Sequence, residues 1–148
     1  MSYQTLSFER NDHIGIIDIN GPLDCQVKIA QLSDDFVELL AEIAWKNQTR
    51  VIVLTGSGNR PFSVSSDLIK EVCKISEQRG IGFRSLAEPI ARLDRPVIAA
   101  IKGDAIGQGL ELALACDLRI ATEASHFDLL GQGVMCLVDI PSVSTKNG

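Results

Sequence analysis

Apolar and polar residues alternate in the first twenty positions of the chain, and longer apolar runs follow. The alternation at residues 6–10 and 14–19 predicts two strands, and the Asn11-Asp12 pair between them predicts the turn of a β-hairpin. Uninterrupted apolar runs that end at turn residues are typical of buried strands. Two such runs predict further strands at residues 50–55 and 97–101, and residues 118–121 are expected to form a third.

Apolar residues at helical spacing occur between these strands. Ser33 is the predicted N-cap of an amphipathic helix whose apolar face runs from Phe36 to Ile43, and Asp34-Asp35 place negative charge in its first turn. Strands that alternate with helices predict an α/β fold, with largely parallel pairing in the middle and both faces of the sheet covered. Three shorter helices are expected at residues 68–75, from the capping-box pattern at 85–88 to Asp94, and at 110–116.

Two segments combine small residues with the start of a helix directly after a buried strand. They are residues 62–68 and 103–111. The N-terminus of a helix offers unpaired main-chain N–H groups and a positive dipole end, so it can hold an anion or a developing oxyanion. The second segment does not match the Gly-x-Gly-x-x-Gly dinucleotide pattern, which argues against a Rossmann site. Either segment taken alone is also compatible with an ordinary glycine-containing turn.

The order of these segments resembles one family. The strand Arg50–Gly56, the pattern Phe62-x-x-x-Ser66-Asp67-Leu68 and the block from Arg95 to Phe127 are similar to the crotonase (enoyl-CoA hydratase/isomerase) superfamily, over residues 1 to about 130. The resemblance implies an α/β fold built as a crotonase-like spiral of ββα units. It also implies a single core domain over residues 1–148 that lacks the family's C-terminal helical region. Assembly into a homo-oligomer, a trimer or hexamer in the family, is expected.

The same resemblance implies an acyl-CoA thioester as the substrate, with coenzyme A arriving as part of it and no separate cofactor or metal. The main-chain N–H groups of Ser66 and Gln108 would form the oxyanion hole that holds the thioester carbonyl while it gains enolate character. Glu111 coincides with the family's first catalytic glutamate. The residues expected to contact the substrate are Asp67, Leu68, Lys70 and Gly107.

Two departures from the family pattern bear on the reaction. The position of the second hydratase glutamate, four residues after Phe127, is Gly131, whereas hydration normally uses two carboxylates to activate water and deliver a proton. Asp139, twelve residues after Phe127, resembles the catalytic aspartate of dienoyl-CoA isomerases and aromatic acyl-CoA dehalogenases. A turn residue before Pro141 is the competing interpretation of Asp139. The sequence therefore favours an isomerase- or hydrolase-like reaction over hydration.

Two other functional classes stay open. A non-catalytic crotonase-like subunit or CoA-ester binder would fit both Gly131 and the short chain. A ClpP-type serine peptidase, which has a related spiral fold, would need a Ser–His pair, and His126 lacks the flanking pattern for one.

Composition and charge exclude several further classes. Fourteen Lys and Arg against nineteen Asp and Glu give a net charge of −5, and the basic residues are scattered singly, which argues against nucleic-acid binding. No apolar run approaches the ~20 residues of a membrane span, and the N-terminus has no secretory signal, so a cytoplasmic location is expected. The two histidines have no useful partner nearby in the sequence, which predicts no zinc site. Without a Cys-x-x-Cys pair, buried free thiols are expected at Cys25, Cys73, Cys116 and Cys136.

Overall fold

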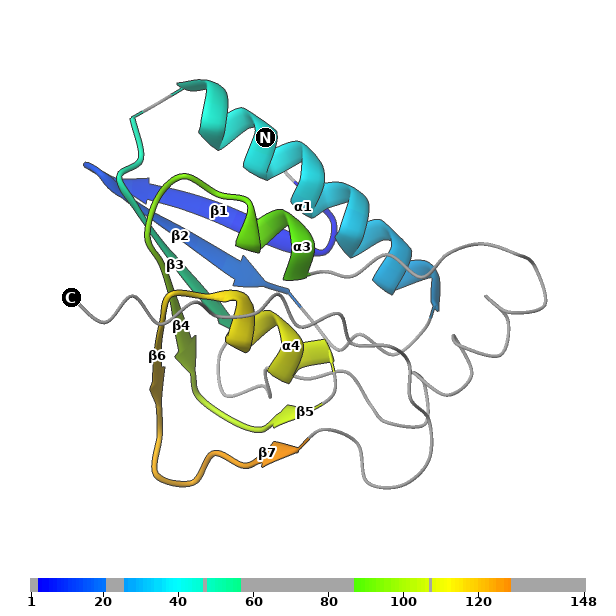
Figure 1. Ribbon diagram of the computed structural model, residues 1–148. Helices are drawn as coiled ribbons and strands as arrows, with labels where there is room; N and C mark the ends of the chain where they lie inside the picture. Colours follow the sequence, from blue (N-terminus) through cyan, green and yellow to red (C-terminus); the bar gives the residue numbers. More distant parts are fainter. Residues whose placement is uncertain (1–2, 21–25, 47, 57–86, 107, 129–148) are drawn as a thin grey trace.

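The computed structural model describes residues 3–20, 26–46, 48–56, 87–106 and 108–128, and the following statements concern these ranges (Figure 1). They form a sheet of five strands, a second sheet of two short strands, and three helices. In chain order the elements are β1 (Leu6–Asn11), β2 (Ile14–Ile19), α1 (Gln26–Lys46), β3 (Val51–Gly56), α3 (Ala87–Ala91), β4 (Val97–Ile101), β5 (Ala105–Ile106), α4 (Gln108–Ala115), β6 (Leu118–Ala121) and β7 (Phe127–Asp128).

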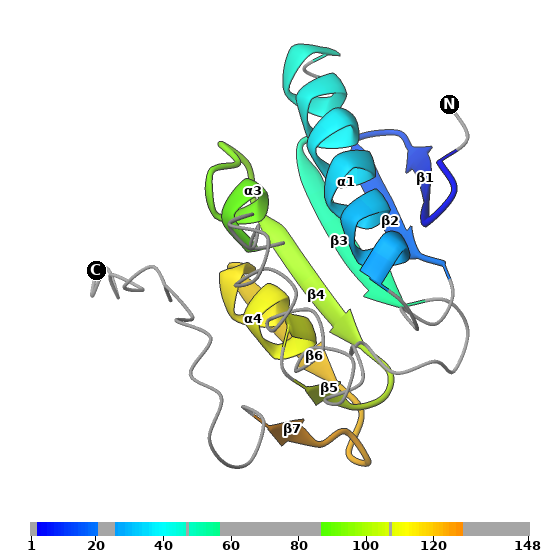
Figure 2. The ribbon, with the colours of Figure 1, turned by 90° about the vertical axis from the view of Figure 1, so that its right-hand side faces the viewer.

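The large sheet has the strand order β1-β2-β3-β4-β6. β1 is antiparallel to β2, which confirms the predicted hairpin, and every other neighbouring pair is parallel, as predicted for the middle of the sheet. β5 and β7 pair in parallel beside it. Helices α1, α3 and α4 lie on the same face of the large sheet, which is seen in both views of the ribbon (Figures 1 and 2).

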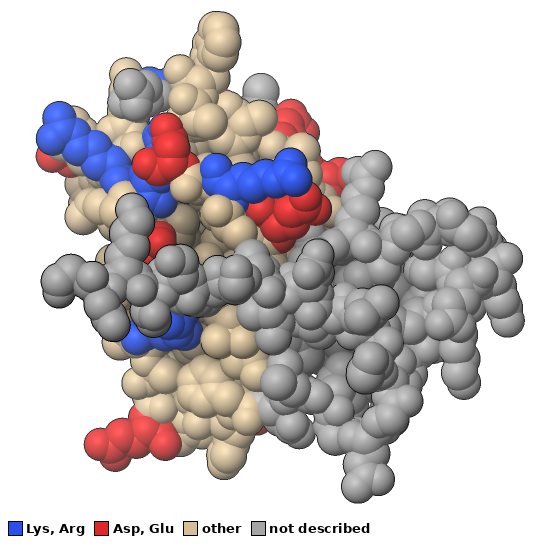
Figure 3. Space-filling model, in the orientation of Figure 1, with Lys and Arg blue, Asp and Glu red and all other residues tan. Residues whose placement is uncertain are grey.

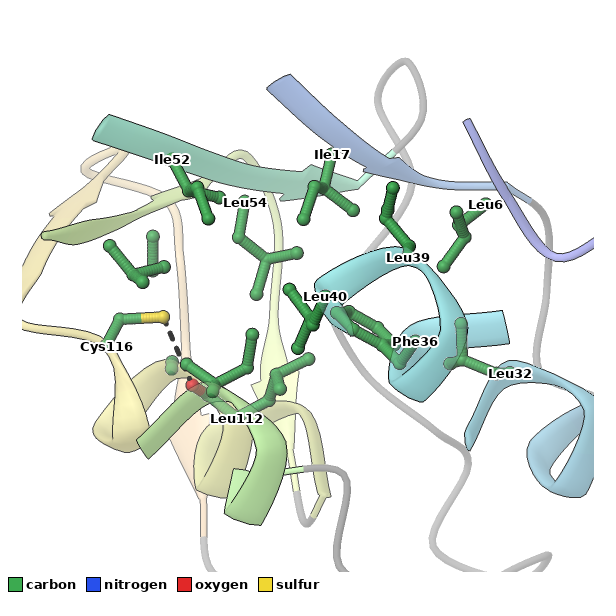
Figure 4. Packing of buried hydrophobic residues seen from close by; sticks show 14 of the residues in the cluster. Leu6, Ile17, Leu32, Phe36, Leu39, Leu40, Ile52, Leu54, Leu112 and Cys116 are labelled. Carbon is green, nitrogen blue, oxygen red and sulfur yellow. Dashed lines mark hydrogen bonds between the residues drawn. The ribbon is translucent and has the colours of Figure 1, made fainter. Parts of the chain in front are cut away.

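The core lies between this face of the sheet and the three helices. Side chains alternate along a strand, so Ile17, Leu54 and Ala99, which are partners across β2, β3 and β4, all point to the helices and are fully buried. The apolar face of α1 meets them, with Phe36 and Leu39 buried against the strands (Figure 4). This packing explains why the apolar runs of β3 and β4 form strands, whereas all four residues of β6 at the sheet edge are exposed.

The opposite face of the large sheet is also apolar. Its cross-strand partners are Ile16 of β2, Val53 of β3, Ile98 of β4 and Leu118 of β6, and no described helix covers them. The first three are half-buried, while Leu118 at the sheet edge is 59% exposed. Within the described residues, the predicted covering by helices is therefore found on one face of the sheet only.

Helix α1 begins earlier than predicted. It starts at Gln26, so Ser33 is not its N-cap, and no acidic residue lies in its first turn. Instead Ser33 and Asp35 are buried in the helix interior. The Asp35 carboxylate accepts hydrogen bonds from Thr5, from its main-chain N at 3.1 Å and its Oγ1 at 2.7 Å. A tertiary contact thus satisfies the side chain that, by local preference alone, would mark a helix start.

The remaining helices differ from expectation by a few residues. α3 ends at Ala91 rather than near Asp94, and Pro89 is tolerated because it lies in the first turn, where main-chain N–H groups have no helical acceptor. α4 begins at Gln108 rather than 110, and the predicted turn at 103–109 contains the short strand β5. The predicted helix at 68–75 and the first half of the capping box at 85–88 lie outside the described residues.

Charged side chains of both signs lie close together on the surface. Lys46 pairs with Glu42 on α1, and Arg92 pairs with Glu88 on α3. In Figure 3 basic and acidic side chains accordingly alternate over the upper part of the face that is shown. No helix among the described ranges is long and apolar enough to cross a membrane.

Candidate functional site

The first turn of α4 holds the two predicted site residues that the structure describes. The chain leaves β4, passes through β5 and enters α4 at Gln108, which is the first helical residue. Glu111 lies in the same first turn, and only 9% of its surface is exposed. The main-chain N–H groups of a first helical turn have no acceptor within the helix, and the helix dipole is positive there. This turn can therefore stabilise negative charge.

The sequence of α4 explains why Glu111 is buried. Its neighbours Leu110, Leu112 and Ala113 are also buried, so the helix is apolar around most of its circumference. α4 packs against α3 and contributes Leu112 to the core, which Cys116, directly after the last residue of α4, also joins (Figure 4). A carboxylate in the first turn of such a helix is kept close to the protein interior, where electrostatic interactions are stronger than in water.

The segment that leads into α4 is held in place by hydrogen bonds between an aspartate and a histidine, which we call the clamp. Asp104 Oδ1 accepts a hydrogen bond from the main-chain N of His126 at 3.1 Å and lies 2.9 Å from its ring Nδ1. These bonds from His126 lower the pKa of the Asp104 carboxyl. One residue further, Ala105 N donates to His126 O at 2.9 Å, where β5 begins to pair with β7. His126 has no zinc-ligand partner nearby in the sequence, and the structure pairs it with a carboxylate 22 residues away.

The C-terminal end of α4 is also fixed. Arg119 Nη1 donates to the carbonyl oxygens of Cys116 at 2.8 Å and Ala113 at 3.3 Å, which caps carbonyl groups at the helix end. Asp117 and Val97 exchange two hydrogen bonds, from Val97 N to Asp117 Oδ2 at 2.8 Å and from Asp117 N to Val97 O at 2.9 Å. Helix α4 is therefore held to β4 and β6 at one end and follows the clamped turn at the other.

Cys116 confirms the expectation of a buried free thiol. Its Sγ donates to Leu112 O at 3.3 Å, and burial raises the pKa of the thiol to about 12. The other three cysteines, Cys25, Cys73 and Cys136, lie outside the described residues. Among the residues that are described, no group of three His, Cys, Asp or Glu side chains is placed to hold a metal ion.

The structure thus brings Gln108 and Glu111 together in one helical turn. The other predicted site residues lie outside the described ranges, so their roles stay predictions. They are Ser66, Asp67, Leu68, Lys70, Gly107 and Asp139, and Gly131, the position of the family's second glutamate, lies outside these ranges too. The pairing of Asp104 with His126 was not found from the sequence, because the two residues are 22 positions apart and only the fold brings them together.

Comparison with known proteins identifies similar chains. Residues 9–134 match the sequence model of the family described as enoyl-CoA hydratase/isomerase. A protein of Bacillus subtilis (strain 168), YngF, which is named for the same family, is 40% identical over 129 residues, covering 84% of this chain and 49% of its own length. The chain spans about half the length of the curated relatives it matches.

Solved structures agree in fold. A crystal structure of an enoyl-CoA hydratase from Bacillus anthracis has a TM-score of 0.69 at 32% identity, over 84% of this chain and 50% of that one. A monofunctional enoyl-CoA isomerase from M. smegmatis has a TM-score of 0.64 at 29% identity, over 89% of this chain and 56% of that one. The crotonase-like α/β fold predicted from the sequence is confirmed.

Proposed function

This chain belongs to the enoyl-CoA hydratase/isomerase family, and we propose that it binds acyl-CoA thioesters at the first turn of α4. The observation that carries the proposal is that Gln108 opens this helix while Glu111 lies buried in the same turn. In the proposal, the main-chain N–H groups of Gln108 and Ser66 donate to the thioester oxygen. A positioned donor of this kind contributes roughly 3–4 kcal/mol to a developing oxyanion.

The proposed reaction is a shift of the double bond in the acyl chain. Glu111 removes a proton from the α-carbon of a 3-enoyl thioester, and the electron pair moves onto the carbonyl oxygen to give a dienolate. The same carboxyl then returns the proton to the γ-carbon, so the double bond ends between the α- and β-carbons. One acid/base group suffices for this sequence, whereas hydration also needs water to be activated. Gly131, which has no side chain to act as a second carboxylate, supports the shift over hydration.

Two further functions are compatible with the same turn. Hydrolysis of the thioester would use the same oxyanion donors, whereas Asp139 resembles the catalytic aspartate of dienoyl-CoA isomerases and aromatic acyl-CoA dehalogenases. Binding of a CoA ester without turnover is supported by Gly131. We also propose that the chain acts in the cytoplasm as a homo-oligomer, which the apolar second face of the large sheet supports.

The test measures acyl-CoA binding and double-bond conversion in two variants, each of which replaces one glutamate by glutamine. Calorimetric titration with butyryl-CoA is expected to show tighter binding than free coenzyme A, and 3-hexenoyl-CoA is expected to convert to the conjugated 2-enoyl ester. Glu111→Gln should lower the conversion rate by ~10²–10⁴-fold while leaving butyryl-CoA binding within a few-fold. Glu123→Gln, at an exposed position, is the matched control and should leave both unchanged.

Each outcome identifies a different function. Binding of butyryl-CoA without conversion of either 3-hexenoyl-CoA or crotonyl-CoA would support the non-catalytic binder. Release of free thiol from the ester would support hydrolysis. Rapid hydration of crotonyl-CoA, or a folded sample that binds no acyl-CoA, would overturn the proposal.

A further inference from the structure

A cavity lies at the other end of the large sheet from the first turn of α4. Its volume is about 480 Å³, which is within the range of small-molecule sites. It is formed between β1 and the C-terminal end of α1, and Thr49, which lines it, comes just before the first residue of β3. The chain reaches α4 from the C-terminal end of β4, which is parallel to β3. The cavity is thus separate from the proposed acyl-CoA site.

The floor of the cavity is apolar and depends on a glycine. Phe8, Ile43 and Thr49 line it. A Cβ atom on Gly15 would lie 2.8 Å from Phe8 Cε2 and 2.9 Å from Thr49 Cγ2, closer than such atoms can approach. The missing side chain at position 15 therefore leaves room for both the Phe8 ring and the Thr49 methyl group on the floor of the cavity.

The rim of the cavity carries one charge that is not balanced. Glu42 is engaged on both oxygens, since Lys46 pairs with Oε1 and the Tyr3 hydroxyl donates to Oε2 at 3.2 Å. The hydrogen bond from Lys46 lowers the pKa of the Glu42 carboxyl, so Lys46 and Glu42 neutralise each other. Arg10 donates through Nη1 to Gln48 Oε1, which is a neutral amide. Among the described residues, no carboxylate forms an ion pair with the Arg10 guanidinium.

The segment that carries Gln48 is fixed from the strand side. His13 Nδ1 lies 3.1 Å from Gln48 O, and Arg50 N donates to His13 O at 2.8 Å. Because these bonds hold the main chain of residues 48–50 beside the hairpin, the Gln48 amide can keep the Arg10 side chain at the rim. A guanidinium that is already oriented presents two parallel N–H donors to a carboxylate.

We propose that this cavity is a second binding site, specific for a small organic carboxylate with an apolar body. The carboxylate pairs with the Arg10 guanidinium at the rim, and the apolar body packs on Phe8, Ile43 and the Thr49 methyl group. The site takes an aromatic or short aliphatic acid, and its occupation does not require the acyl-CoA site to be filled.

The chain contains a single tryptophan, Trp45, which is 91% exposed and adjacent to Lys46 in α1. Its fluorescence is a signal that comes from this end of the helix alone. Titration of the intact chain with sodium benzoate is expected to give a saturable change in the millimolar range, typical of a ligand of this size. Calorimetry under the same conditions gives an independent measure of the binding. Benzamide, which has the same shape without the charge, should bind at least tenfold more weakly.

The matched variants remove one positive charge each. Arg10→Gln is expected to weaken benzoate binding by at least about tenfold, whereas Arg92→Gln, on α3 and not part of the cavity, should leave it within twofold. Circular dichroism checks that both variants fold. If Arg10→Gln does not fold, the comparison of benzoate with benzamide on the unaltered chain still decides. The proposal is overturned if benzoate does not saturate either signal, if benzamide binds equally well, or if both variants lose affinity to the same degree.

Discussion

Replacing Asp35 by alanine should remove a large part of the stability of this fold. Asp35 is buried in the middle of α1 and accepts three hydrogen bonds, two from Thr5 and one from Gln31 Nε2 at 2.9 Å. The two bonds from Thr5 tie the start of β1 to the helix that covers it. Without the carboxylate, the Thr5 N–H and hydroxyl are left buried without an acceptor.

The expected cost follows from these contacts. A hydrogen bond to a charged group contributes about 1.5–3 kcal/mol, and bonds that share one acceptor group are not additive. We therefore expect Asp35→Ala to lower the free energy of unfolding by about 3 kcal/mol, which is roughly 140-fold in the folding equilibrium. Asp35→Asn keeps one acceptor oxygen for Thr5 and should cost only about 1 kcal/mol.

The same contact predicts a pH dependence. Burial opposes ionisation of Asp35, but the hydrogen bonds from Gln31 and Thr5 outweigh it and lower the pKa of the carboxyl below its ordinary value of 3.8. The native state thus favours the ionised form more than the unfolded state does. The resulting stability is fully present above pH 3.8 and is lost as the pH falls through the native pKa. The difference between the unaltered chain and Asp35→Asn should therefore be constant near neutrality and shrink in acid.

Urea unfolding followed by circular dichroism measures both effects. Glu38→Ala, an exposed position on the same helix, is the control and should change the free energy by less than about 0.5 kcal/mol. An Asp35→Ala variant as stable as this control, or a gap to Asp35→Asn that widens in acid, would refute the reasoning.

Two further predictions concern buried groups. Arg95→Met should lower the free energy of unfolding in urea by about 3 kcal/mol. The buried guanidinium of Arg95 donates to the carbonyl oxygens of Ile43 at 3.1 Å and Thr49 at 2.8 Å, and methionine cannot donate to either. Arg92→Met, which is exposed, should be nearly neutral, and equal losses in the two variants would contradict this account. Cys116, with a thiol pKa of about 12, should resist alkylation by iodoacetamide at pH 8 in the native chain and react once the chain is unfolded in urea. Mass spectrometry of the peptide that contains Cys116 measures the alkylation. Rapid labelling of the native chain would contradict the prediction by showing that the thiol is accessible.

Local patterns were enough to locate the strands of the large sheet. β2, β4 and β6 have the predicted bounds, and β3 is displaced by one residue. β3 and β4 contain short apolar runs that end at turn-forming residues, and β2 alternates, so in each case the signal lies within the segment itself. Parallel pairing was predictable because helices separate these strands along the chain.

The parts that sequence did not reveal depend on distant partners. The start of α1 was misplaced because Ser33 and Asp35 have strong local preferences for a helix N-terminus, whereas Thr5 satisfies Asp35 from 30 residues away. β5 and β7 are too short for any periodic signal and are defined only by their pairing. For the candidate site, the chemistry of Glu111 came from the family resemblance, while its burial in the first turn of α4 needed the fold.

The apolar second face of the large sheet predicts how the proposed homo-oligomer responds to salt. With a net charge of −5, copies repel one another in dilute buffer, and this repulsion reaches only about 8 Å at physiological ionic strength. Salting-out ions such as sulfate also strengthen the attraction between apolar surfaces. Association through Val53, Ile98 and Leu118 should therefore tighten as salt is added, whereas an assembly held by ion pairs would loosen. Low ionic strength is therefore the condition in which the proposed association should be weakest.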